Sequence, residues 1–96
     1  MADRGLDRAV SGIVKRLDPV AVATYGEGRG ILVVAESLVD SRAKRAEAAR
    51  ESAGRAGRMY DYTVITPREL REIRFDPDNP IASIVASCKV VHGSLE

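Results

Sequence analysis

Residues 20–34 read VAVATYGEGRGILVV, and this stretch decides how the chain folds. Residues 20–24 and 31–35 are short apolar runs rich in Val, Ile and Ala, a pattern that indicates buried β-strands. Between them, Gly26, Gly28 and Gly30 stand at alternate positions, and glycine adopts positive φ without a steric penalty. The chain can therefore reverse within a few residues, and we predict a β-hairpin with its turn at residues 25–30.

Helices are expected on either side of this hairpin. Apolar residues recur at helical spacing over residues 3–17, with Asp3 as the cap and with the end of the helix fixed by the proline at position 19. A second, alanine-rich helix is predicted from residues 36–37 to 54 or 57, opened by Ser37 and Asp40 as a capping box. Arg42 falls near the middle of its apolar face, either as a stem that snorkels to solvent or as a ligand contact.

The second half of the chain predicts two more strands and two short helices. Residues 59–65 form the third strand, and Thr66, Pro67 and Glu69 then open a helix that ends at 73 or 74. Asn79 opens a last helix over residues 81–87, and residues 89–92 form a short edge strand. The order α-β-β-α-β-α-α-β is typical of an α+β protein whose helices pack on a small, mixed or mostly antiparallel sheet.

Length and composition describe an ordinary small domain. The 96 residues are enough for one domain, which we place at residues 1–94, while Leu95 and Glu96 could be the remnant of an expression tag. A net charge of +1 gives no global field that would favour nucleic acid or an anionic membrane. The single cysteine, Cys88, cannot form an internal disulfide. With no apolar run near the roughly 20 residues of a membrane span and no signal peptide, we expect a cytoplasmic protein without a membrane partner.

Few residues are candidates for chemistry. The spacing of the glycine turn is not that of a dinucleotide-binding or phosphate-binding loop, and it leads into a strand rather than a helix. His92 is the sole histidine, and no second histidine or cluster of acids accompanies it, so no zinc site is predicted. Asp61 is an acid in an apolar strand. It either faces water at the start of the strand, or points inward to bind a metal or to pair with Arg29 or Arg42.

Taken in order, these segments resemble the small nucleotidyltransferase domains related to DNA polymerase beta, and the likeness covers most of the chain. Such domains have a first helix that leads into a phrase like residues 16–22, RLDPVAV, and a first strand that ends in Gly-Ser, here Gly26-Glu27. Their second strand, Asp-x-Asp-Leu-Leu-Val-Val, is matched by residues 28–34. Their third strand carries an acid and runs into Thr-Pro-Glu-Glu-Leu, matched by residues 61–70, and residues 79–93 look like their closing helix and strand.

The resemblance implies a site that has lost its ligands. Members of this family hold triphosphate at the Gly-Ser turn and use three carboxylates to bind two magnesium ions. Here Glu27 replaces the serine, Gly28 and Gly30 replace the paired aspartates, and Asp61 alone remains as the third acid. One carboxylate cannot assemble a two-metal site. Gly26, Glu27, Gly28, Gly30 and Asp61 are therefore interpreted as vestigial positions, with no catalytic residue, metal or other cofactor.

We therefore expect a catalytically inactive binding or protein-interaction module. Its partner would be a helical protein, as the resemblance suggests, or a second copy of the chain, with Arg29 and Arg42 as possible contacts. One alternative is a divergent magnesium-dependent nucleotidyltransferase, acting on protein or nucleic acid, in which Glu27, Glu36 and Asp61 replace the lost carboxylates. A second alternative is nucleic-acid binding through the arginine-rich residues 42–58, which the near-zero net charge disfavours.

Overall fold

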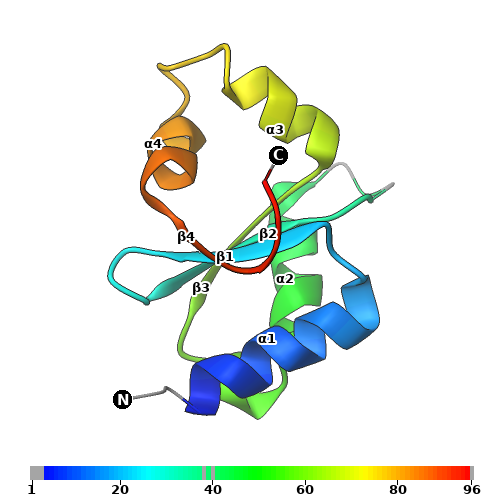
Figure 1. Cartoon of the computed structure of the whole chain (residues 1–96). Helices are drawn as coiled ribbons and strands as arrows, with labels where there is room; N and C mark the ends of the chain where they lie inside the picture. Colours follow the sequence, from blue (N-terminus) through cyan, green and yellow to red (C-terminus); the bar gives the residue numbers. More distant parts are fainter. Residues whose placement is uncertain (1–3, 38, 40, 96) are drawn as a thin grey trace.

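The computed structural model describes residues 4–37, 39 and 41–95, and it has the predicted α+β order. Its helices are α1 (Arg4–Leu17), α2 (Arg42–Ala53), α3 (Pro67–Ile73) and α4 (Pro80–Ser87), with a short 3-10 turn, η1 (Arg55–Gly57), after α2. Its strands are β1 (Ala21–Tyr25), β2 (Gly30–Val34), β3 (Asp61–Ile65) and β4 (Lys89–Gly93). Figure 1 shows the sheet in the middle of the molecule, with α1 and α2 on one side and α3 and α4 on the other.

The sheet is mixed, in the strand order β3-β2-β1-β4. The predicted hairpin is confirmed, because β1 pairs with β2 in antiparallel fashion from Ala21↔Val34 to Tyr25↔Gly30. The edge strand β4 also runs antiparallel to β1. The strands β2 and β3 are parallel, so the chain must cross over between them, and α2 provides the crossover.

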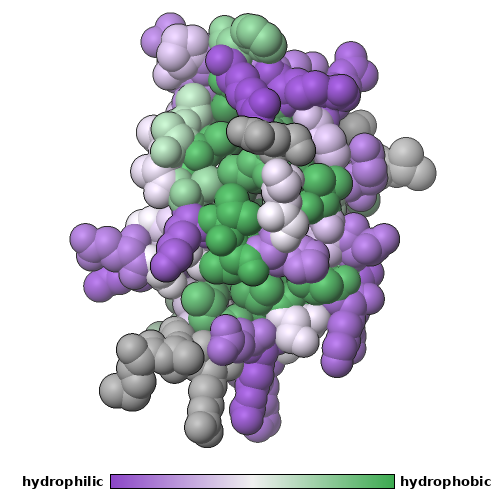
Figure 2. All heavy atoms as spheres, viewed as in Figure 1, coloured by the Kyte–Doolittle hydropathy of each residue, from purple (hydrophilic) through white to green (hydrophobic). Residues whose placement is uncertain are grey.

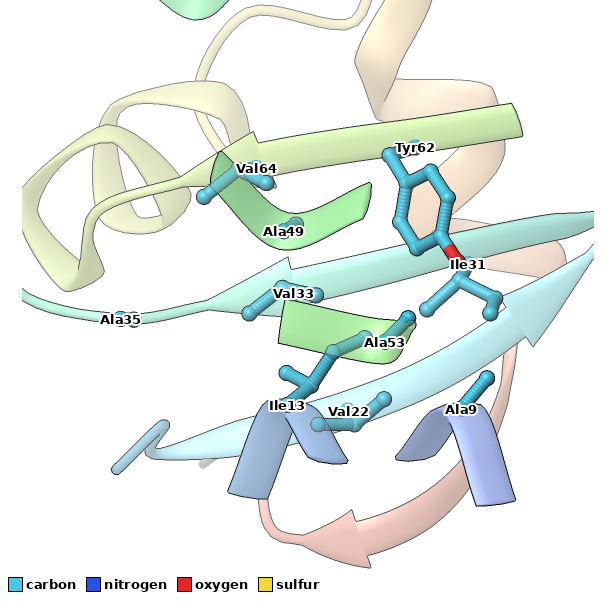
Figure 3. Packing of buried hydrophobic residues seen from close by; sticks show 10 residues of the cluster. All are labelled: Ala9, Ile13, Val22, Ile31, Val33, Ala35, Ala49, Ala53, Tyr62 and Val64. Carbon is cyan, nitrogen blue, oxygen red and sulfur yellow. The ribbon is translucent and has the colours of Figure 1, made fainter. Parts of the chain in front are cut away.

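Strand residues alternate between two apolar cores, one on each face of the sheet. Between the sheet and the pair α1 and α2, the buried strand side chains include Val22, Ile31, Val33 and Tyr62. Figure 3 shows how they meet residues of the two helices, which are Ile13, Ala9, Ala49 and Ala53. The opposite face is covered by α3 and α4 over Ala21, Ala23, Leu32, Val34 and Ile65. Because successive strand residues point to opposite faces, the run from Ile31 to Val34 is buried throughout.

The predicted start of the second helix is wrong. The hydroxyl of Ser41 accepts a hydrogen bond from the backbone N–H of Lys44, so α2 begins at Arg42 rather than at residues 36–37. Ser37 instead accepts from the N–H of Val39 two residues ahead, at 3.1 Å, a local bond that competes with helix formation. The other proposed cap partners, Asp3 and Asp40, lie outside the described residues.

The shorter elements follow the prediction closely. Thr66 and Glu69 form the reciprocal capping box of α3, with Pro67 in the first turn, and the side chain of Asn79 caps α4. The third strand starts at Asp61, two residues later than predicted, because Met59 and Tyr60 belong to the turn after η1.

Leu95 belongs to the folded domain. Leu95, which the sequence analysis left outside the domain, packs against the core under α3 and α4. Its carbonyl accepts a hydrogen bond from the Arg74 guanidinium at 2.5 Å.

None of the helices that the structure describes is both long enough and apolar enough to cross a membrane.

Candidate functional site

The turn of the hairpin is held in a left-handed conformation. Gly26, Glu27 and Gly28 have φ values of 59°, 58° and 87°. The backbone N–H of Gly28 donates to the carbonyl of Tyr25 at 3.2 Å, which closes the turn. A positive φ favours glycine, which explains Gly26 and Gly28. Glu27 has a positive φ although it is not a glycine, and its side chain is exposed. We call Gly26, Glu27, Gly28, Gly30 and Asp61 the hairpin site.

The strand register brings the two halves of the hairpin site together. Gly30 is the first residue of β2, and it pairs with Tyr25 of β1 on one side and with Asp61 of β3 on the other. The N–H of Asp61 donates to the carbonyl of Arg29 at 3.0 Å. Asp61 is the first residue of its strand and is exposed, so of the two orientations left open by the sequence, it adopts the one that faces water.

Tyr25 fills the space above Gly30. A Cβ atom added to Gly30 would overlap the ring of Tyr25, and the Tyr25 hydroxyl is 2.9 Å from the Thr63 hydroxyl. Tyr25 therefore reaches from β1 across β2 to β3, on the face of the sheet where a side chain at position 30 would project. Sequence reasoning missed this role, although an aromatic residue opposite a strand glycine is a recognised way of covering the gap that glycine leaves.

The three acids of the enzyme alternative do not gather in one place. Glu27 and Asp61 lie at the end of the sheet where β2 begins, whereas Glu36 lies beyond the end of β2, after Ala35. The six residue-to-residue steps from Gly30 to Glu36 span roughly 20 Å at the rise of an extended chain. Within the described part of the chain, no group of three or more His, Cys, Asp or Glu side chains could hold a metal ion.

Arg45, which the sequence analysis did not single out, is the buried cation of α2. Its side chain is 7% exposed, and its guanidinium donates to the carboxylate of Glu69 at 2.5 Å and to the carbonyl of Val39. Arg42 is instead 55% exposed at the start of the helix, with its Nε 3.9 Å from Glu69. The signal for Arg45 was its spacing, because it stands four and eight residues before Ala49 and Ala53, the other buried residues of α2.

Glu69 is the anion that compensates this charge. Partial burial would by itself raise the pKa of its carboxyl group, but the hydrogen bonds from the Thr66 backbone N–H and from Arg45 outweigh that effect and hold the pKa below its ordinary value. Because Glu69 also completes the capping box of α3, one carboxylate joins α2 to the start of α3. This ion pair is a structural link between helices rather than a ligand site.

The remaining arginines of residues 42–58 form no uniform basic surface. Arg50, Arg55 and Arg58 line a surface hollow of about 260 Å³ near the end of α2, and Glu51 lines it with them. The guanidinium of Arg50 lies 5.9 Å from the centre of the Tyr62 ring, in cation–π geometry. The described arginines of this segment are thus divided between an internal ion pair, an aromatic ring and a hollow of mixed charge.

Comparison with known proteins adds no relative to these observations. The chain matches no protein-family model, no curated protein sequence and no solved structure.

Proposed function

We propose that this chain is a catalytically inactive nucleotidyltransferase-like domain that acts as a binding or protein-interaction module. The observation that carries the proposal is the contact of Tyr25 with Gly30 beside Asp61.

The strand register supports the likeness to nucleotidyltransferases. In such an enzyme, the second aspartate of the pair and the third acid must stand side by side to share metal ions. The corresponding positions in this chain, Gly30 and Asp61, are register partners on adjacent strands. These two positions therefore lie side by side, as a shared metal ion would require, but only Asp61 carries a carboxylate, and Gly28 and Gly30 carry none.

The packing of Tyr25 supports the loss of catalysis. The space that an aspartate at position 30 would occupy contains the Tyr25 ring, which is anchored by its hydroxyl contact with Thr63. A side chain cannot return to position 30 unless the tyrosine moves. We infer that the packing of Tyr25 over Gly30 has taken the place of a metal ligand at position 30. The surfaces of the domain would then serve recognition rather than catalysis.

Nuclear magnetic resonance of the amide groups tests the proposal. Uniformly labelled protein is titrated with magnesium, with a nucleoside triphosphate, and with both together. We expect small, unsaturated shifts at residues 26–30 and 61 that do not depend on the presence of both ligands. Saturable shifts at these residues that require magnesium and nucleotide together, and that the variant D61N abolishes, would contradict the proposal.

A further inference from the structure

Phe75 is an exposed aromatic residue held on an ordered turn. It is the only phenylalanine of the chain, and it is 88% exposed. Its N–H donates to the carbonyl of Glu72 at 3.1 Å, and the N–H of Asp76 donates to Ile73 at 3.0 Å. These bonds fix the turn between α3 and α4, which Figure 1 shows at the end of the molecule away from α1. A single exposed apolar side chain is common on protein surfaces, and it points to a contact only where other exposed apolar surface adjoins it.

An apolar groove lies beside this turn, between α3 and α4. It has a volume of about 480 Å³. Its apolar lining residues are Ile73, Pro77, Ala82, Val85 and Ala86. Phe75 itself is not among the lining residues, but its backbone lies between two of them in sequence, Arg74 and Pro77, so it stands next to the groove along the chain. A phenyl ring removes on the order of 150–250 Å² of surface from water when it is buried, so a ring that entered this groove would bury apolar surface on both sides.

The helix that forms one wall of the groove has no charge on its outer surface, where the serines Ser83 and Ser87 are exposed. The sequence of α4, PIASIVAS, contains no charged residue, although 30% of the whole chain is charged. Within α4, all of which the structure describes, Ile81 alone is buried. Its other large apolar residues, Ile84 and Val85, are partly buried against the core, so the part of α4 that stays exposed beside the groove is small and uncharged. Figure 2 shows hydrophobic residues gathered in the middle of the face viewed, with hydrophilic residues around them.

The segments before and after Phe75 have opposite net charge. Two cations and one acid, Arg71, Arg74 and Glu72, precede the aromatic residue, and two acids, Asp76 and Asp78, follow it, all of them exposed. When two copies of such a segment approach about a two-fold axis, they run antiparallel, so the positive half of each faces the negative half of the other. The net charge of +1 adds little general repulsion between two copies.

We propose that two copies of this chain associate by reciprocal insertion of Phe75 into the groove between α3 and α4. The proposal specifies the partner of the interaction role suggested above, and it rests on that role but not on the loss of catalysis. Because Phe75 and the groove are neighbours along the chain, a single two-fold axis can bring the Phe75 of each copy to the groove of the other. This is the geometry of an isologous dimer. An interface centred on two aromatic side chains is small, so we expect a dimer in exchange with the monomer rather than a permanent one.

Light scattering and sedimentation of the full chain over about 10 µM to 1 mM test the proposal, since this range brackets dissociation constants of a small interface. We expect a concentration-dependent dimer, and F75E should weaken it by about thirtyfold or more, the effect of losing an interface hot spot. M59E is the matched control, because Met59 is 91% exposed but lies in the turn before β3, and it should dimerise normally. A86W, which fills the groove and leaves Phe75 intact, should weaken the dimer as F75E does.

Isotope-filtered nuclear magnetic resonance gives a second readout that does not depend on these variants. In a mixture of labelled and unlabelled chains, we expect intermolecular contacts between the Phe75 ring and the methyl groups of Ile73 and Val85. A chain that stays monomeric throughout the concentration range would overturn the inference. So would a dimer that F75E and A86W leave unchanged, since it would use another surface. Neither result would bear on the magnesium titration, so a failure of this inference is distinguishable from a failure of the inactive site.

Discussion

The ring of Tyr25 covers Gly30 on the neighbouring strand, in the space that a side chain at position 30 would need. The two residues are register partners, and the tyrosine hydroxyl continues to Thr63 on the next strand. Glycine at this position is therefore explained by packing, because its φ lies outside the positive range that would by itself demand glycine.

This contact predicts the effect of adding a methyl group at position 30. G30A should lower the free energy of unfolding by about 1–3 kcal/mol, the usual effect of overpacking a well-filled site. Urea unfolding measures the change. In the background Y25A, the same substitution should have a much smaller effect, because the ring with which the methyl group collides is gone. Equal effects in the two backgrounds would show that Tyr25 is not the obstacle.

The ion pair between Arg45 and Glu69 predicts a second stability change. E69Q removes the carboxylate that pairs with the 7% exposed guanidinium of Arg45, so the free energy of unfolding should fall by about 3 kcal/mol, the lower end of the range for a broken buried pair. The control is E72Q, which removes the exposed pair of Arg68 and Glu72 and should change stability by less than about 0.5 kcal/mol. If both variants had the same small effect, Arg45 would not depend on Glu69.

The lowered pKa of Glu69 predicts a stability loss in acid. A carboxyl group whose pKa is lower in the folded than in the unfolded protein stabilises the fold above its ordinary value of 4.5, and this stabilisation disappears as the pH falls through the lower folded value. Urea unfolding of the unmodified chain and of E69Q from neutral to acid pH measures it. We expect the two stability curves to differ at neutral pH and to converge below pH 4.5. A constant difference across this range would contradict the assignment.

Tyr62 predicts an effect at the opposite end of the pH scale. Burial raises the pKa of its hydroxyl to about 12, against a smaller lowering effect of Arg50, and the hydroxyl donates to the carbonyl of Gly57 at 2.7 Å. Its contribution to stability should be complete below pH 10.0, the ordinary value, and should be lost as the pH rises towards 12. Ultraviolet absorbance should show a tyrosine that ionises near pH 12, and Y62F should remove that step.

Local signals in the sequence predicted most of the fold. The hairpin, the capping box of Thr66 and Glu69, and the asparagine cap of α4 depend on residues a few positions apart, and the structure has each of them. The start of α2 was predicted wrongly because Ser37 and Ser41 are both good caps. In the structure, the helix that begins after Ser41 buries Arg45 against Glu69. Glu69 lies 24 residues further along the chain, so this contact is not a local signal.

The candidate site was predictable in its residues but not in its packing. Asp61 could be named from the sequence, but its orientation depended on where β3 begins. The role of Tyr25 required the registers of two strand pairs, β1 with β2 and β2 with β3, and the second pair is formed across a helical crossover. Such non-local pairings leave little trace in a single sequence.

Manganese, a paramagnetic substitute for magnesium, tests the loss of the two-metal site most directly. Our account predicts weak, unsaturated broadening of the amide signal of Asp61, similar to that at an exposed acid elsewhere such as Asp78 and unchanged by a nucleoside triphosphate. Saturable broadening centred on residues 26–30 and 61, and strengthened by the nucleotide, would contradict it.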